Sequence, residues 1–439
     1  MCRGVRRSVG FLLAVAGSGG VLFDFGGTII NPAIPYLESL KLFTTAELSH
    51  LTSAVVMTAA FSGLFAGMLA ERFGRRPTML FAATLAACAC LPICFCGGNY
   101  WPFYIGRAIQ GFAAGLIGVV VPMYLAETLP AEARGKGAGV FQLMDVVGIL
   151  FCSLVGLATV HCLGAADDPT VSAEAKNTAW KTIFFSSLVP AVVFLLGALC
   201  IEESPVWKQV PVCERVSSGR LATGSLFSRR YMLPFVIAVA VLVCNQAIGC
   251  NAVQYYALKM FQDAGLGNAV ANAANVSLWV VMLGFTLVGT AFVDRAGRKT
   301  ILKLGTAGLA VACLSAGGFF CAIEKGWLAS SALTGWLVVA SMALYIASFS
   351  VGPGVVVWLA LSELMPDRIR ANGMAIGLFL NMMVAYAISD VFLQWVEKSG
   401  YSTVLFALAG FSILYFLVAA LLLPETKGKT LAEIERMFA

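Results

Sequence analysis

The sequence predicts an all-α integral membrane protein with twelve transmembrane helices in two pseudo-symmetric six-helix bundles. The first observation is composition, since 59% of the 439 residues are hydrophobic and only 12% are charged. A soluble domain has about 25% charged residues, so this chain has too few to cover a surface that faces water. The other two observations are a series of long apolar runs and a charged motif that occurs once in each half.

The apolar runs have the length that a membrane helix needs, because roughly 20 residues cross the hydrocarbon core of a bilayer. The stretches between the runs are too short for a sizeable soluble domain. Twelve spans are expected near residues 10–31, 50–70, 77–97, 102–125, 136–159, 180–201, 232–258, 272–293, 300–322, 335–361, 371–395 and 402–424.

The repeated motif relates the two halves of the chain. It reads ERFGRR at residues 71–76 and DRAGRK at residues 294–299, each time in a short loop between apolar runs. An internal repeat of this kind is typical of secondary transporters. We expect an N-terminal bundle at 1–201, a cytoplasmic linker with a short helical segment at 202–231, a C-terminal bundle at 232–424 and a cytoplasmic tail at 425–439.

Lys and Arg residues predict the orientation, because they concentrate in cytoplasmic loops. Most of the 29 Lys and Arg residues fall on one side if both termini are cytoplasmic. The net charge of +6 is therefore a topology signal, and no soluble domain offers a basic face for nucleic acid. The expected location is the plasma membrane, or the inner membrane of a bacterium, with the lipid bilayer as the surrounding partner and a monomer as the functional unit.

Motifs for catalysis are missing from the sequence. It contains no G-x-x-x-x-G-K-[ST], H-E-x-x-H or G-x-S-x-G pattern, so we expect neither an enzyme nor an ATP-driven pump. The pairs Cys88-x-Cys90 and Cys94-x-Cys96 flank Pro92 in an apolar span, where thiols are ordinary packing residues. No metal site and no cofactor are expected, and transport would run downhill or on an ion gradient.

Polar side chains inside the spans are candidates for function, because each costs a few kcal/mol unless it faces a cavity or a partner. Gln142 and Asp145 in the fifth span are three residues apart and share one helical face. Glycines predict breaks in the seventh span at Gly249 and in the tenth at Gly352-Pro353-Gly354. Amides and aromatic rings together suit a neutral polyhydroxyl ligand, which hydrogen-bonds through its hydroxyls and stacks its apolar face. A single such amide could equally bridge two helices.

The charged loops have a second expected role besides anchoring the topology. We expect arginines of the repeated motif to form ion pairs with acidic residues at helix ends. These pairs would close the cytoplasmic mouth, and the mouth would open when they separate. Glu127 precedes Arg134 by seven residues in the first half, and Glu363 precedes Arg370 by seven in the second. The expected gate network consists of Arg72, Arg75, Arg76, Glu127, Arg134, Glu203, Asp294, Arg298, Glu363, Arg370 and Glu425.

These residues together resemble the sugar porter family of the major facilitator superfamily, over nearly the whole chain. The two charged loops, the run from Gly106 to Gly135, NQAIGCNAVQYY from Asn245 and PETKG from Pro424 carry the resemblance. It implies a twelve-helix fold, alternating access and a monosaccharide, a hexose or a pentose, as substrate. The implied substrate-binding residues are Gln142, Asn245, Gln246, Asn251, Tyr255, Trp358 and Asn381.

The chain departs from the family pattern where protons would be coupled. Proton-coupled members pair an Asp on the first span with the Arg of the fourth, which here is Arg107. Gly26 occupies that Asp position and Asp24 lies two residues earlier, about 200° away around an ideal helix. Asp145 is an additional acid next to Gln142. Asp24, Arg107 and Asp145 are the proton-coupling candidates.

Proton symport of a monosaccharide is the favoured function. Gly26 opposes proton coupling, so a facilitative uniporter for a sugar or polyol is the alternative. Met282 and Met382 replace an Asn and a Trp of the family pattern, which favours another polyol or a small organic solute as the substrate. A nutrient sensor that does not transport is less favoured, because sensors of this fold usually carry long cytoplasmic extensions.

Overall fold

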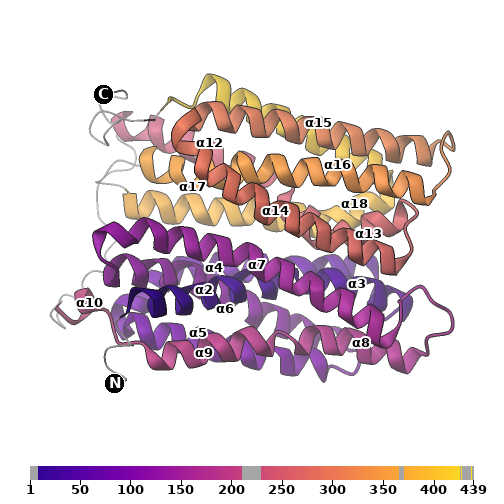
Figure 1. The fold of residues 1–439 in the computed structure, drawn as a ribbon, viewed down its shortest axis with the longest axis horizontal. Coiled ribbons are helices and arrows are strands. Elements are labelled where there is room, and N and C mark those ends of the chain that lie inside the picture. Colours follow the sequence, from indigo (N-terminus) through magenta and orange to yellow (C-terminus); the bar gives the residue numbers. More distant parts are fainter. Residues whose placement is uncertain (1–7, 210–228, 365–369, 426, 428–436, 438–439) are drawn as a thin grey trace. The chain divides into compact units, whose positions relative to one another are not determined.

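The computed structural model describes residues 8–209, 229–364, 370–425, 427 and 437. Within these ranges all regular secondary structure is helical. The chain divides into two compact units, residues 1–221 and 222–439 (Figure 1). The helices of unit 1 are α2 (Val9–Thr28), α3 (Ile30–Ser39), α4 (Thr45–Phe73), α5 (Arg75–Cys94), α6 (Tyr100–Thr128), α7 (Ala131–Leu163), α8 (Ala173–Phe185), α9 (Leu188–Cys200) and α10 (Pro205–Gln209).

Unit 2 is built in the same way from long apolar helices. Its elements are α12 (Arg229–Ala247), α13 (Cys250–Asp263), α14 (Asn268–Ala296), α15 (Arg298–Glu324), α16 (Ala332–Val351), α17 (Pro353–Leu364) and α18 (Arg370–Leu421).

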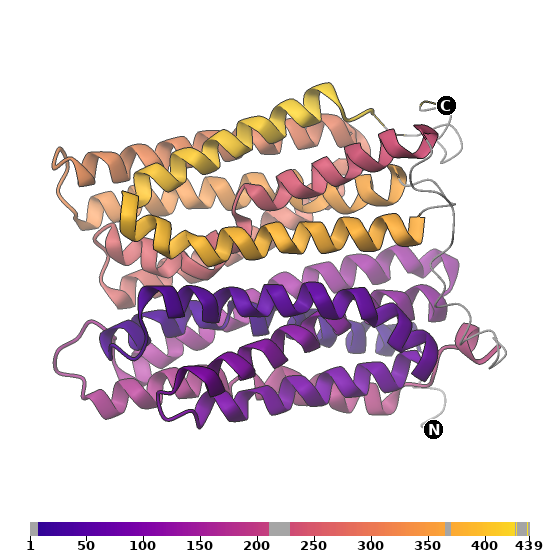
Figure 2. The same cartoon turned by 180° about the vertical axis from the view of Figure 1, so that it is seen from behind.

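The twelve predicted spans are confirmed. Eleven continuous stretches of the described residues are long and apolar enough to cross a membrane. The last of them, Gly373–Leu421, contains two predicted spans, because α18 is divided at Gly400, where φ is 78° and ψ is 164°. Figure 2 shows the two arms of α18 turning back on each other at that end. The linker residues 210–228 lie outside the described residues, so the predicted domain bounds stay predictions.

Both predicted breaks occur within unit 2. The seventh span divides into α12 and α13 at Gly249, which adopts a left-handed conformation with φ 82° and ψ 27°. The tenth span divides into α16 and α17 at Gly352, with Pro353 as the first residue of α17. A proline fits this first position, since its missing N–H is not needed there. Two spans are therefore discontinuous close to their polar residues.

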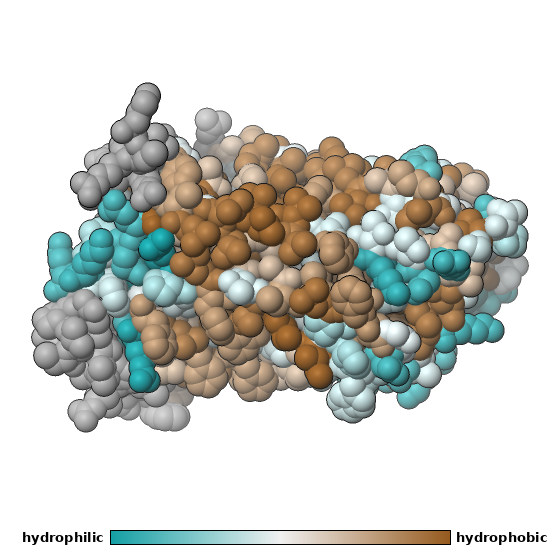
Figure 3. Space-filling view, turned by 90° about the horizontal axis from the view of Figure 1, so that it is seen from below, coloured by the Kyte–Doolittle hydropathy of each residue, from teal (hydrophilic) through white to brown (hydrophobic). Residues whose placement is uncertain are grey.

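The surface agrees with a protein that lies in a bilayer. Figure 3 shows apolar residues across the middle of the visible face, with hydrophilic residues toward its two ends. Large apolar side chains such as Phe65, Leu196 and Leu304 are about half exposed or more, at 49%, 57% and 66%. Such exposure is costly in water and favourable against lipid tails.

Candidate functional site

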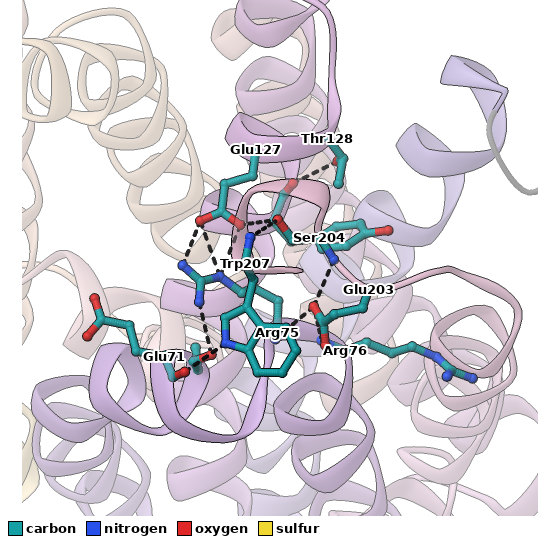
Figure 4. A network of polar contacts seen from close by, with 10 residues as sticks. Glu71, Arg75, Arg76, Glu127, Thr128, Glu203, Ser204 and Trp207 are labelled. Atoms are coloured by element: carbon teal, nitrogen blue, oxygen red, sulfur yellow. Dashed lines mark hydrogen bonds and ion pairs between the residues drawn. The ribbon is translucent and has the colours of Figure 1, made fainter. Parts of the chain in front are cut away.

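A charged network joins the start of α5 to the end of α6 in unit 1. The Arg75 guanidinium donates from Nε to Glu127 Oε2 at 3.0 Å and from Nη2 to Glu127 Oε1 at 2.7 Å. Its Nη1 donates to the carbonyl oxygen of Ala70 at 3.1 Å, and the Ser204 hydroxyl donates to Glu127 (Figure 4). A planar guanidinium on a carboxylate at two points is a strong and directional contact.

Glu203 binds the same region through the backbone rather than through arginine side chains. Its carboxylate accepts hydrogen bonds from the N–H groups of Arg75 at 3.0 Å and Arg76 at 3.2 Å. These are the first two residues of α5, and the start of a helix attracts negative charge because its N–H groups have no partner within the helix. Gly74 precedes them with φ 106°, a conformation that favours glycine.

Unit 2 repeats this helix start. Glu425 accepts from the N–H groups of Arg298 at 3.0 Å and Lys299 at 3.2 Å, the first residues of α15, after Gly297 with φ 89°. The two copies of the charged motif therefore share a three-dimensional arrangement as well as a sequence. In both, a distant glutamate caps the helix that follows the glycine.

A third helix start of this kind was missed by the sequence interpretation. Within α18, Gly400 has φ 78°, and Glu324 accepts hydrogen bonds from the Ser402 N–H at 3.1 Å and from the Ser402 hydroxyl. The signal was a glycine between two predicted spans and an acid at the end of another, too short a pattern to recognise alone.

The side chains of Arg72 and Arg76 lie apart from these contacts. Arg72 is exposed, with its guanidinium 5.4 Å from the centre of the Phe73 ring. The Arg76 guanidinium donates to the carbonyl oxygens of Leu199 at 2.8 Å and Ala198 at 3.3 Å. The side chains of Arg134, Asp294, Glu363 and Arg370 lie outside the described part of the chain.

Arg107 is fully buried in unit 1 and binds backbone carbonyl groups. Its Nη1 donates to the carbonyl oxygen of Gly26 at 2.6 Å and to Gln110 Oε1 at 2.8 Å. Its Nη2 donates to the carbonyl oxygen of Gly27 at 3.1 Å, and its Nε donates to that of Leu51 at 3.1 Å. Gly26 and Gly27 lie in the last turn of α2, where carbonyl groups carry partial negative charge. The end of α2 thus supplies much of the stabilisation that the positive charge requires.

A small cavity lies beside Gly26, at the position where the family pattern would place an acid. Its volume is about 10 Å³, comparable with the space for one water molecule, and Gln110 and Ser187 line it. A Cβ atom on Gly26 would meet only Gln110 Cβ, at 4.0 Å. The Nε2 of Gln110 is buried without a hydrogen-bond partner among the described groups. Because Gly26 has no side chain, open space remains at the position where the family pattern would place an acid.

Asp24 is brought to Asp145 in the structure. Their carboxyl groups lie within hydrogen-bonding reach of each other, across the contact between α2 and α7. Asp145 is 8% exposed and Asp24 is partly buried. Gln142 donates from Nε2 to Asp145 Oδ2 at 3.3 Å, as expected for residues on one helical face. Two acids and an amide thus form one cluster inside the membrane-spanning part of unit 1.

Three of the predicted sugar-binding residues meet around the α12–α13 break. Gln246 donates to Asn381 Oδ1 at 3.2 Å, and Asn381 donates to the carbonyl oxygen of Leu242 at 2.8 Å. The Cys250 thiol lies 3.4 Å from Gln246 Oε1 and 3.5 Å from Asn251 Oδ1. The break therefore brings Gln246 and Asn251, five residues apart, to the same thiol. Asn381 is fully buried, and its contacts bridge two helices.

The remaining predicted binding residues differ in exposure. Asn245 is 3% exposed, and its Oδ1 has no hydrogen-bond partner among the described groups. Tyr255 is 4% exposed, whereas Trp358 is 39% exposed and can offer a ring face. Their role in binding stays a prediction.

Two units of six membrane spans each, discontinuous spans and buried polar clusters define a secondary membrane transporter. The chain belongs to the family described as "Sugar (and other) transporter", whose model matches residues 14–214 and 212–438. It is a transporter of this family and not an enzyme. The predicted resemblance to sugar porters of the major facilitator superfamily is thus confirmed.

Relatives match the chain over nearly its full length. It is 30% identical to plastidic glucose transporter 4 of Arabidopsis thaliana, over 96% of this chain and 79% of that protein. It is 25% identical to the arabinose-proton symporter of Bacillus subtilis, over 98% and 96%. The inward-open structure of the xylose transporter XylE from E. coli matches with a TM-score of 0.81 and 25% identity, over 98% of this chain and 100% of that one.

Proposed function

We propose that the chain moves a monosaccharide, a hexose or a pentose, across the membrane together with protons by alternating access. The observation that carries this proposal is the cluster of Asp24, Asp145 and Gln142 within the spans of unit 1. Ionisable side chains are expensive inside a bilayer, so such a cluster marks an ion or substrate path by default. The similarity to an arabinose-proton symporter supports the same class of reaction.

The proposed substrate-binding residues suit a sugar chemically. Gln142, Asn245, Gln246, Asn251 and Asn381 offer amide donors and acceptors for sugar hydroxyls that must leave water. Tyr255 and Trp358 add aromatic rings on which an apolar sugar face can stack. The unpartnered Oδ1 of Asn245 supports this assignment most directly, because a buried acceptor is stabilised when a ligand hydroxyl donates to it.

The charged network is proposed as the cytoplasmic gate. Arg75 and Glu127 supply the ion pair, while Glu203 and Glu425 hold the helix starts in their units. Breaking and remaking these contacts would accompany opening and closing. We propose that both termini lie in the cytoplasm and that the membrane is a plasma membrane or a bacterial inner membrane; the Lys and Arg distribution supports the orientation. The functional unit is proposed to be a monomer.

Facilitated diffusion of a sugar or polyol is the second candidate. Gly26 favours it, because the residue that would pair with Arg107 in a proton-coupled relative is missing and backbone carbonyls bind the guanidinium instead. The similarity to plastidic glucose transporter 4 supports transport of a sugar, but it does not indicate whether that transport is coupled to protons.

Uptake by purified protein in proteoliposomes tests the substrate class. A panel of labelled hexoses, pentoses and polyols is offered to the wild type and to Asn245→Ala, with empty liposomes as the control. Uptake of at least one monosaccharide, lost in Asn245→Ala, supports the proposal. Uptake confined to polyols, or to no member of the panel, would contradict it.

A further inference from the structure

We infer that Asp24 and Asp145 act as one carboxyl pair that holds a single shared proton, and that this is the proton moved in each transport cycle. The inference rests on the proposed symport and deepens it, since it names the proton site and separates it from Arg107.

Two glycines allow α2 and α7 to approach closely. A Cβ atom on Gly20 of α2 would lie 2.5 Å from the carbonyl oxygen of Phe141 and 3.2 Å from the backbone nitrogen of Asp145. A Cβ atom on Gly148 of α7 would collide with the backbone of Val21. Small residues permit such backbone contact between membrane helices. Side chains as short as aspartate can therefore meet across this interface.

The acids lie on the faces that these glycines bring together. Asp24 follows Gly20 by four residues on α2, so both point to the same side. Gln142, Asp145 and Gly148 are spaced by three residues on α7 and share one face as well. The contact between the two carboxyl groups thus follows from helix register, and both acids are fixed by the same packing.

The buried oxygen of Asp145 lacks a hydrogen-bond donor. Its Oδ1 has no partner among the described groups, although Asp145 is only 8% exposed. Two carboxylates in contact cannot both stay ionised in a medium of low dielectric constant, and one proton between them removes the repulsion. A shared proton would supply the donor that the structure otherwise lacks at this position.

Among the side chains that the structure describes, no Lys or Arg acts on the Asp24 or Asp145 carboxyl in place of that proton. Among the described residues, the titratable group that acts on each carboxyl is the other member of the pair. Arg107 of α6 and Cys152 of α7 lie instead near the end of α2, where Arg107 contacts Gly26 and Cys152 is close to Thr28. Two of the hydrogen bonds of Arg107 run to the carbonyl groups of Gly26 and Gly27 at the end of α2. On α9, which also packs against α2, the residue in contact with Gly19 is the apolar Phe194.

Gln142 provides the link from the proton to the sugar. Its Nε2 donates to Asp145 Oδ2 at 3.3 Å. A hydrogen bond to an ionised carboxylate is roughly twice as strong as one to a neutral acceptor. Loss of the proton would therefore draw the amide toward Asp145, and protonation would release it for a sugar hydroxyl. Proton and sugar would then bind more tightly together than apart, which is the requirement for symport.

The test compares two assays in proteoliposomes for Asp24→Asn, Asp145→Asn and the matched control Asp390→Asn, an acid in α18. The sugar is the one identified by the uptake panel. The first assay measures accumulation driven by an inward proton gradient. The second measures exchange of labelled for unlabelled sugar at equal pH, which needs no net proton movement. Sugar-induced alkalinisation outside the liposomes, followed with a pH indicator, reports the proton directly.

Both pair variants are expected to keep exchange within about threefold of the wild type, while accumulation falls to equilibrium and alkalinisation disappears. Asp390→Asn should keep all three. Two outcomes would overturn the shared-proton pair: accumulation of sugar by either Asn variant, or loss of both exchange and accumulation in both variants. In either case the symport proposal would still stand if the wild type accumulates sugar. A wild type that shows neither accumulation nor alkalinisation would instead overturn the symport proposal itself.

Discussion

Arg75 and Glu127 form a two-point ion pair in which the arginine side chain is 10% exposed and the glutamate side chain 15% exposed. The pair joins the first residue of α5 to the end of α6, so it fixes the ends of two long helices. Removing one partner of such an enclosed pair destabilises a protein more than removing one partner of an exposed pair, because the remaining charge stays partly desolvated.

Replacing Glu127 with Ala should therefore destabilise the protein by about 2 kcal/mol or more. The midpoint of thermal unfolding in detergent should fall by several degrees. Glu71→Ala is the matched control, since the Glu71 carboxylate points away from Arg75 in Figure 4. Equal midpoints for the two variants would show that the ion pair contributes little.

The glycines that start α5 and α15 should not tolerate a side chain. In Gly74→Ala and Gly297→Ala the added methyl group would meet the carboxylates of Glu203 and Glu425, and both positions have positive φ. We expect poor expression or a large loss of thermal stability. Gly67→Ala is the control, because a Cβ atom at this position of α4 would meet nothing within 4 Å. Normal stability of all three variants would contradict the capping geometry.

Two glycines of α2 should respond oppositely to alanine. In Gly20→Ala the methyl group would press on the Phe141 carbonyl of α7, so the helices must separate and the initial rate of sugar uptake should fall at least about tenfold. Gly26→Ala places its methyl group beside the small cavity and should keep near-normal stability and uptake. Measured side by side, equal activity of the two variants would contradict the close contact between α2 and α7.

The amides of the two units should be needed for substrate binding. Gln142→Ala and Asn251→Ala are each expected to lower uptake by about tenfold or more, while membrane insertion and elution from a sizing column stay normal. Each lost hydrogen bond to a sugar hydroxyl costs about 0.5–1.5 kcal/mol, and an orphaned hydroxyl costs more. Gln262→Ala, at the end of α13, serves as the control. Near-normal uptake by both binding variants would remove them from the sugar site.

The fold could be predicted from the sequence because its signals are local. Apolar runs predict spans, glycine and proline predict the breaks at Gly249 and Gly352, and the repeated motif predicts two related units. The ion pair between Arg75 and Glu127 could also be predicted from the sequence, since opposite charges at neighbouring helix ends attract each other.

The partners of Arg107 and Asp24 could not be predicted in the same way. Helical geometry alone placed Asp24 on a different side from position 26, but it did not show that α7 lies on that side. That contact depends on Gly20 and Gly148, which are separated by more than a hundred residues. Backbone carbonyl groups as partners of Arg107 have no sequence signal, because every residue carries one.

The measurement that tests proton coupling most directly is sugar accumulation by the wild-type protein in proteoliposomes. The outside solution is one pH unit more acidic than the inside, and the membrane potential is clamped. A symporter that moves one proton per sugar should raise the internal concentration up to about tenfold above the external one, since one pH unit corresponds to about 1.4 kcal/mol. Removing the pH difference should return the ratio to one. A ratio of one under both conditions, reached at the same rate, would contradict proton coupling and make the protein a uniporter.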